Sequence, residues 1–454
     1  MSKPPPPPAD PPIVATFDYS PFRLRPLAPT AAGQSRPRGS RRLICVSHVL
    51  PHPPGAGNAY RIARMLAWLA QHGWEVLLVV CPLVDAEVSE HDVQQAAAVF
   101  PNLIVWRHDN TLLHHVSCDG ALLDTLDGRR PRRFAAAIGE DAAGGERARR
   151  TIDILRMFCP DGPLELLLHL EQHFDPQIVL AEYVFMTRAF PLLRPAVRKA
   201  IDTIDVFSNK PDKVERFGID DFWTMAEREE ARLLERADLL IAIQPEEAAD
   251  LAALAPRVPV VSVGVDFDIP EHVAPPPAAP VILLIGSGNK INAKGLADFL
   301  RFAWPLVRRD VPDAELRVAG LVGASSEVSA PGVRTLGRIE DVGAAYAQAR
   351  LVINPAVAGT GLKIKTVEAL CHLRPIVLWP SGVDGIAPQA RRMCHVANDW
   401  FDFAQQVIRL LRRHDGDEDF VQRRQDLPGH FAADRVYAPL AQALNALTGA
   451  GARD

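Results

Sequence analysis

Short apolar runs alternate with amphipathic stretches along most of the chain from Arg41 onwards. The run RLICVSHV is followed by a Pro/Gly/Asn loop, by a stretch with Ile62, Met65, Leu66 and Leu69 on one helical face, and by a second apolar run, EVLLVVCP. Apolar runs bounded by turn residues are typical of strands buried on both faces, and the spacing between them is helical. The pattern predicts a β-loop-α-β unit of a parallel sheet.

The alternation continues and predicts one doubly wound, Rossmann-like domain over residues 41–268. Further strands are expected at LIVWRH, QIVLAEYV, KAIDTIDVF, DLLIAI and PVVSVGV, with helices near 163–173, near 222–236 and at PEEAADLAAL. The stretch around 110–160 is predicted to be irregular. Seven strand-like runs separated by helices indicate a parallel sheet covered on both faces.

A second α/β domain is predicted over 281–430, after a proline-rich linker at 269–280. Its strands are expected at VILLIGS, AELRVAG, VRTLGR, RLVINPAV, RPIVLWP and CHVA, and its helices near 294–309, 341–349, 361–373 and 399–413. A last helix near 433–447, in the segment 431–454, is expected to return to the first domain. Two such domains enclose a cleft in which ligands bind beyond the carboxyl ends of the strands.

Composition and charge exclude several classes of protein. The segment 1–40 contains a run of five prolines and is predicted to be a disordered head. A net charge of −5 gives no overall cationic field, so a nucleic-acid partner is not expected. The six cysteines form no C-x-x-C pair, and no apolar stretch reaches the roughly 18–20 residues that span a bilayer. A cytoplasmic protein with at most peripheral membrane contact is expected.

The segment 353–386 carries the strongest chemical signal. A predicted strand is followed by Gly359-Thr360-Gly361 at the start of a helix, where free backbone N–H groups and the helix dipole favour a phosphate or diphosphate. Lys363 and Lys365 lie in the first turn, which the dipole disfavours unless an anion is bound. Glu368 follows and can accept hydrogen bonds from a ribose diol. The alternative is an ordinary glycine-opened helix with solvated charges.

The residues GTGLKIKTVEAL, followed by a strand and the loop PSGVDGI, resemble the family 4 glycosyltransferases. These are retaining, nucleotide-sugar-dependent enzymes of the GT-B fold, and the closest branch has the motif G-x-G-(L/V)-K-x-K-x-x-E-A-L. The resemblance extends over about residues 42–445. It implies that Glu368 holds the ribose and that Gly359 to Gly361 lie against the donor diphosphate and sugar. Thr360 stands where many members carry a second glutamate.

Two further segments of the second domain carry the resemblance. LLIGSGNKINAKGLADFL matches the family's G-R-x4-K-G, with Asn289 in place of the arginine and Lys294 at the lysine, which implies that Lys294 neutralises leaving-group charge. Lys363 or Lys365 is then expected to supply the missing cation. TLGRIED resembles the turn whose backbone reads the nucleobase near Arg338 and Ile339. A helix N-cap at Asp341 is a compatible alternative.

In the first domain, HPPGAGNAYRIARML resembles the family's glycine-rich loop across the cleft from the donor. The predicted contact residues are Gly55, Gly57, Asn58 and Arg61, and a plain βα turn is the alternative.

Ile204 stands where many members carry a histidine that contacts the donor sugar. Asp205, Asp202 and Glu182 are the polar groups predicted nearby, and His48 is a candidate substitute for that histidine.

The resemblance implies a hexosyltransferase with Lys294, Glu368 and Asp205 as catalytic residues. The donor is expected to be a UDP- or GDP-sugar and the acceptor a glycan, a lipid-linked molecule or a protein. No cofactor is expected beyond the nucleotide-sugar co-substrate, and no metal is expected. Two alternatives stay open: a catalytically silent binding module, because of Asn289, Thr360 and Ile204, and a sugar-nucleotide epimerase. The basic runs at 128–134 and 147–150 indicate either a solvated loop or contact with an anionic lipid surface.

Overall fold

The structure, a computed structural model, describes residues 41–449 except for short stretches. Those stretches are 53–56, 84–85, 87, 116–122, 124–125, 141–144, 212–216, 219–223, 270–272, 325–328, 340, 359–362, 414–419 and 422–424. The predicted disordered head, residues 1–40, lies outside the described residues.

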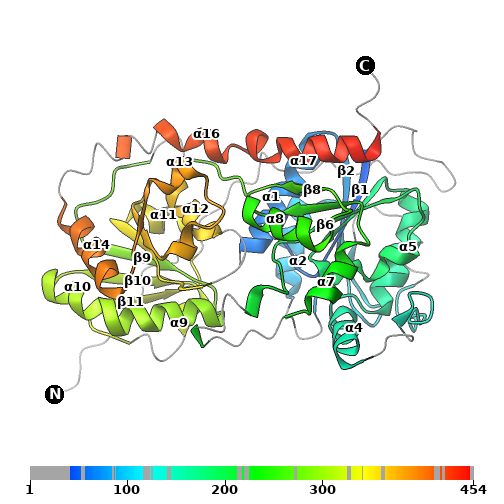
Figure 1. Ribbon diagram of the computed structural model, residues 1–454, viewed down its shortest axis with the longest axis horizontal. Coiled ribbons are helices and arrows are strands. Elements are labelled where there is room, and N and C mark those ends of the chain that lie inside the picture. Colours follow the sequence, from blue (N-terminus) through cyan, green and yellow to red (C-terminus); the bar gives the residue numbers. More distant parts are fainter. Residues whose placement is uncertain are drawn as a thin grey trace.

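Two sheets form the framework of the chain, and each belongs to its own lobe (Figure 1). The first has the order β4-β3-β2-β1-β5-β6-β7-β8, and all its pairs are parallel except β3 with β4. Its strands are β1 (Arg41–Ser47), β2 (Trp74–Val80), β3 (Leu103–Trp106), β4 (Leu112–His115), β5 (Ile178–Glu182), β6 (Arg198–Asp202), β7 (Leu239–Ala242) and β8 (Val260–Ser262).

The second sheet is parallel throughout and has the order β11-β10-β9-β12-β13-β14. Its strands are β9 (Val281–Ile285), β10 (Glu315–Ala319), β11 (Val333–Gly337), β12 (Leu351–Asn354), β13 (Ile376–Leu378) and β14 (Cys394–Val396). The strand order reverses beside β9, which is where ligands bind in doubly wound sheets.

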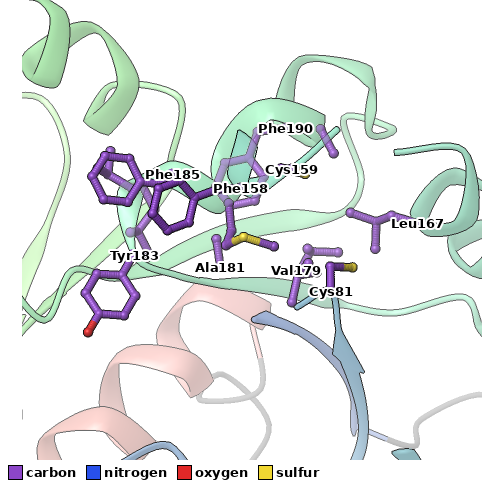
Figure 2. Close-up of a cluster of buried hydrophobic side chains, with 14 of the residues drawn as sticks. Cys81, Phe158, Cys159, Leu167, Val179, Ala181, Tyr183, Phe185 and Phe190 are labelled. Carbon is purple, nitrogen blue, oxygen red and sulfur yellow. The ribbon is translucent and has the colours of Figure 1, made fainter. Parts of the chain in front are cut away.

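Helices cover both faces of the first sheet because alternate strand residues point to opposite faces. One apolar cluster joins it to α1 (Gly57–Gln71), α2 (Glu90–Val99) and α17 (Ala433–Thr448). The other joins it to α4 (Glu146–Phe158), α5 (Asp161–Phe174), the 3-10 helix η3 (Val184–Leu192), α7 (Glu227–Leu234) and α8 (Pro245–Leu254). Figure 2 shows Phe158 and Phe185 of this second cluster beside Ala181 of β5.

Helices cover the second sheet in the same way. One face carries α9 (Lys290–Asp298), a π-helical turn η5 (Phe299–Ala303), α10 (Trp304–Asp310) and α14 (Trp400–Arg412). The other carries α11 (Val342–Ala347), α12 (Ile364–Cys371) and α13 (Pro388–Arg391). The short elements η6 (Leu321–Ala324), η8 (Pro380–Val383) and α16 (Pro428–Phe431) complete the described part.

The prediction that the stretch around 110–160 is irregular is wrong near both of its ends. The stretch contains the antiparallel edge strand β4, an eighth strand of the first sheet, and the 13-residue helix α4. In α4 an apolar face that includes Ile154, Leu155 and Phe158 is buried, while Arg149 and Arg150 are exposed. Tertiary burial of that one face stabilises a helix whose basic sequence hides the pattern.

The chain passes between the two lobes twice, and both connecting segments are bonded to the first domain. The first is the crossover segment, residues 263–268, where Arg64 of α1 donates hydrogen bonds to Asp266 and Asp268. The second leads into α17, whose Tyr437 Oη donates to Asp266 Oδ1 over 2.7 Å. Phe267 N donates to Phe431 O over 3.0 Å, so the two connecting segments contact each other directly. In Figure 1, α16 and α17 run along the top of both lobes.

Candidate functional site

The carboxyl ends of β9 and β12 meet at the point where the strand order of the second sheet reverses. Asn289 caps α9, and its Oδ1 accepts a hydrogen bond from Asn292 N over 2.8 Å. A Cβ on Gly295 would lie 2.6 Å from Pro355 O, so α9 contacts the backbone that follows β12. This close approach needs glycine and brings the Lys294 turn of α9 next to the loop that leads into α12.

Gly295→Ala is therefore expected to destabilise the chain by about 1–3 kcal/mol, because a backbone carbonyl must move to admit the methyl group. The measurement is the midpoint of urea unfolding. Gly264→Ala is the matched control, since a Cβ on Gly264 meets nothing within 4 Å, and it should shift the midpoint little. Equal midpoints for the two variants would contradict the contact.

The start of α12 holds a buried cation. Within the described part of the chain, Lys365 Nζ is buried and has no hydrogen-bond partner. Burial lowers the pKa of Lys365 to about 8, and the nearby Glu368 carboxylate opposes this shift. A buried, unpaired ammonium group is unfavourable unless an anion neutralises it. The first turn of α12 is therefore ready to receive an anionic group.

Glu368 lies one turn further along α12 and is held by a neighbouring helix. Tyr346 Oη of α11 donates a hydrogen bond to Glu368 Oε2 over 3.0 Å. Burial raises the pKa of Glu368, while the Tyr346 hydrogen bond and Lys365 act in the opposite direction. The arrangement places a cation and a hydrogen-bond acceptor in adjacent turns of one helix.

The other residues predicted on the donor side are Lys294, Lys363 and the segment from Gly359 to Gly361. Lys294 Nζ lies 2.9 Å from Asp298 Oδ2, so part of its charge is already compensated. Lys363 is the N-cap residue of α12, and Gly359, Thr360 and Gly361 lie outside the described residues.

The predicted nucleobase turn leads directly into α11. Arg338 is exposed, and Ile339 packs against the cluster beneath α11 and α12. Asp341 caps α11, because its Oδ1 accepts a hydrogen bond from Ala344 N over 2.6 Å. The turn and the helix that carries Tyr346 therefore form one local unit.

The first domain meets this region at the start of α1. A Cβ on Gly57 would lie 2.7 Å from Ile364 Cδ1, so the starts of α1 and α12 contact each other across the two domains. Asn58 Nδ2 donates to Tyr183 Oη over 3.0 Å. Gly55 lies outside the described residues. The structure thus brings Gly57 and the Lys365 turn close together.

Arg61 has a different role from the predicted one. Its side chain is fully buried, and it donates to both oxygens of Asp202 over 2.8 Å and to the carbonyl oxygens of Val263 and Gly264. These partners lie 141 to 203 residues away in sequence, so the helical position of Arg61 alone could not reveal them. Arg61 anchors the crossover segment and does not present its guanidinium to a ligand.

Arg61→Met is expected to destabilise the chain by about 3–5 kcal/mol, because Asp202 would remain buried without its cation. The loss should appear as a lower denaturant midpoint. Arg198→Met removes a half-exposed arginine whose Nη1 lies 3.6 Å from Asp238 Oδ1, and it should change stability by under about 1 kcal/mol. An unchanged midpoint in Arg61→Met would refute the anchoring role.

The polar groups predicted near Ile204 differ in how deeply they are buried. Asp202 is engaged by Arg61, and Glu182 is fully buried with its pKa raised by burial. Asp205 stays partly exposed, with its Oδ2 4.0 Å from Lys210 Nζ. Ile204 has φ +57°, a strained value for a β-branched residue, at the carboxyl end of β6. Asp205 is therefore the member of this set that a ligand can reach.

His48 follows β1 and packs between two aromatic rings. Its ring centroid lies 4.8 Å from that of Phe158 and 5.1 Å from that of Tyr183. Burial lowers the pKa of His48 to about 4, so the imidazole is neutral at pH 7.

Two aromatic residues of the site were not predicted from the sequence. Tyr60 of α1 stacks on Phe267, with ring centroids 4.5 Å apart. Burial raises the pKa of Tyr60, and the Glu368 carboxylate contributes to the same shift. Tyr346 is the hydrogen-bond donor to Glu368. The available signals were weak: Tyr60 sits beside the glycine-rich loop, and Tyr346 follows the Asp341 cap by five residues.

Within the described ranges, no three His, Cys, Asp or Glu side chains gather as a metal ion would require. The helices of the described part include none with the length and apolar character to cross a membrane.

Comparison with known proteins connects the second domain to a family. Residues 279–413, from the strand β9 to the end of α14, match the model of the family Glycosyl transferases group 1. Over 136 residues the chain is 27% identical to an uncharacterized 44.6 kDa protein in the cps region of Klebsiella pneumoniae. That match covers 28% of this chain and only 35% of the Klebsiella protein.

Solved structures extend the likeness to nearly the whole chain. Sucrose-phosphate synthase from Thermosynechococcus elongatus has a TM-score of 0.59 at 14% identity, with 90% of this chain and 100% of that chain covered. HepE from Anabaena, in complex with UDP and glucose, gives 0.57 at 11% identity, with 89% and 100% covered. The chain has the GT-B fold. A third GT-B structure, the pneumococcal O-GlcNAc transferase GtfA in complex with UDP and GlcNAc, gives 0.57 at 8% identity, with 90% and 99% covered.

The GT-B fold agrees with the predicted fold class of two doubly wound domains. The group 1 match covers the domain that carries Lys365 and Glu368, while the whole-chain likeness includes the first domain with Gly57 and Asp205.

Proposed function

We propose that the chain is a retaining glycosyltransferase of family 4 type that transfers a sugar from a nucleoside diphosphate sugar to a hydroxyl acceptor. The observation that carries the proposal is the buried ammonium group of Lys365, which has no hydrogen-bond partner among the described residues and lies one turn before the Glu368 carboxylate. A diphosphate supplies the negative charge that this cation lacks, and a ribose supplies two hydroxyl groups for the carboxylate. The HepE structure is a complex with UDP and glucose and the GtfA structure a complex with UDP and GlcNAc, which supports this choice of ligand.

The proposed reaction replaces one bond at the anomeric carbon of the sugar by another on the same face. The bond to the diphosphate oxygen breaks, and its electron pair leaves with the diphosphate. The acceptor oxygen then bonds to the anomeric carbon, and its proton passes to the departing phosphate oxygen. This route needs no nucleophile from the protein. Lys365 and Lys294 would stabilise the departing charge, and the proposal involves no metal ion or cofactor.

Asp205 is the group that we assign to the acceptor side, because it stays partly exposed at the carboxyl end of β6. Its carboxylate would accept a hydrogen bond from the attacking hydroxyl group. The proposed acceptors are a glycan, a lipid-linked molecule or a protein, and the proposed location is the cytoplasm, with or without contact with the inner face of the membrane. Exposed arginines on the first domain, among them Arg130, Arg133 and Arg149, suit contact with an anionic lipid surface.

A thermal-shift screen against UDP, GDP, ADP and TDP and their sugars tests the proposal. At a concentration of 100 times its dissociation constant, the cognate ligand should stabilise the chain by about 2.7 kcal/mol. The cognate sugar nucleotide should then lose its sugar to an added acceptor. Absence of stabilisation by every nucleotide would overturn the proposal, and isomerisation of the donor without acceptor would indicate an epimerase instead.

A further inference from the structure

Tyr346 is held rigidly beside the Glu368 carboxylate. Its side chain is 1% exposed, and its Oη lies 3.0 Å from Glu368 Oε2. Its ring stacks on the ring of His372, with centroids 4.3 Å apart and planes 12° apart. The buried Arg374 donates from Nε to Tyr346 O over 2.7 Å, so the backbone is fixed as well as the ring.

The helix that carries Tyr346 begins at the predicted nucleobase turn. Asp341 caps α11 directly after Arg338 and Ile339, and Tyr346 lies in the same short helix. A displacement of this turn must therefore displace the hydroxyl group that holds Glu368.

We propose that Tyr346 is a positioning residue for the ribose of the donor. Its hydroxyl group occupies Oε2 of Glu368, which leaves Oε1 to accept hydrogen bonds from the two ribose hydroxyls. Tyr346 also joins the nucleobase turn and the ribose-binding carboxylate into one rigid unit. This inference rests on the proposed function and assigns a residue that acts through Glu368.

The charge environment of Glu368 supports this role. The groups that face it are Lys365 and Cys371 on its own helix, Tyr346 on α11 and Tyr60 on α1. Lys365 is the cation of this set, and Tyr346 is the neutral donor that bonds the carboxylate directly. Burial raises the pKa of Glu368, so loss of the phenol hydroxyl should raise that pKa further and protonate more of the carboxylate at a given pH.

The test compares wild type, Tyr346→Phe and Tyr437→Phe. The probes are the nucleoside diphosphate that stabilises the wild type and its 2′,3′-dideoxy analogue, with binding measured by calorimetry between pH 5 and 8. In Tyr346→Phe the ribonucleotide should bind about ten-fold more weakly, as expected for one lost hydrogen bond to a charged group, while the dideoxy analogue should bind unchanged. The acid limb of the ribonucleotide profile should move to higher pH.

Tyr437→Phe is the matched control, since it removes a buried tyrosine hydroxyl that donates to Asp266 in the crossover segment. Its ratio of ribonucleotide to dideoxy affinity should equal that of the wild type. A wild-type ratio and pH profile in Tyr346→Phe would overturn the positioning role alone. A wild type that binds no nucleoside diphosphate would overturn both this role and the proposed function.

Two further variants keep the inference testable if Tyr346→Phe does not fold. His372→Leu removes the stacked ring but keeps the phenol, and it should lower the same affinity ratio. In the Glu368→Gln background, His372→Leu should bring no further loss in that ratio, because the carboxylate through which Tyr346 acts is gone. An independent, additive loss would overturn the proposed coupling.

Discussion

Lys365→Met should bind the donor nucleotide at least ten-fold more weakly than the wild type and yet be more stable without ligand. The ligand-free protein buries an ammonium group whose pKa falls from the usual 10.5 to about 8, which corresponds to a cost of up to about 3 kcal/mol. Methionine removes that cost and fills the same space. The loss of a charge-assisted hydrogen bond to the diphosphate weakens binding by about 1.5–3 kcal/mol. Thermal unfolding with and without nucleotide measures both effects.

The pH dependence of binding gives a second readout of the same lysine. Below about pH 8 Lys365 is charged in the free protein, and donor affinity should be at its full value. As the pH rises through 8, Lys365 loses its proton in the free protein but keeps it in the complex, where the anion stabilises the ammonium form. Binding should therefore weaken and be accompanied by proton uptake. Calorimetry in buffers of different ionisation enthalpy detects the uptake. The control is Lys199→Met, at the amino end of β6 in the first domain, which should keep the wild-type pH profile. A pH-independent affinity in the wild type would contradict the role assigned to Lys365.

Glu368→Gln should lower kcat/KM by at least about 100-fold, because the neutral amide loses the charge that strengthens two hydrogen bonds to the ribose diol. Binding of the ribonucleotide should weaken, whereas the 2′,3′-dideoxy analogue should bind as in the wild type. Steady-state kinetics with the cognate sugar nucleotide and calorimetry with both nucleotides measure the change.

Glu171→Gln is the control for loss of a buried carboxylate elsewhere. Glu171 of α5 is buried and bonds to Arg194, outside the second domain. Its variant should keep the wild-type preference for the ribonucleotide, even if its stability falls. If Glu368→Gln also kept that preference, Glu368 would not be the ribose ligand.

Most strands, though not the edge strand β4, were predictable from the sequence, because a strand buried on both faces consists mainly of consecutive apolar residues. In β3 and β5 every residue is buried; β3 (LIVW) is apolar throughout, and β5 (IVLAE) is apolar up to Glu182. Helix α2 gave no such signal, since it buries only Val93, Ala96 and Val99. Helix α4 was hidden by its exposed arginines. Helices that bury few or small apolar side chains are determined by tertiary contacts more than by the hydrophobic pattern of their sequence.

The candidate site shows the same division between local and distant information. The local order of Lys363, Lys365 and Glu368 identified the helix, but it could not tell which lysine is buried. The structure shows that the buried ammonium group is that of Lys365. Arg61 looked equally suited to a ligand, and only its pairing with Asp202, 141 residues away, shows that it is structural. Sequence position specifies which groups are near a strand end, while side-chain accessibility depends on the completed packing.

The first domain is assembled from two separate parts of the chain, residues 41–262 and α17. During synthesis, β9 to α14 leave the ribosome between these parts and contain all the strands of their own sheet. The apolar strip that Tyr437, Leu440 and Leu444 later cover, over α1, β7 and β8, stays open until the last helix emerges. The domain that is synthesised first is thus completed last, and the nascent chain exposes that strip to chaperones or to aggregation throughout the synthesis of the second domain.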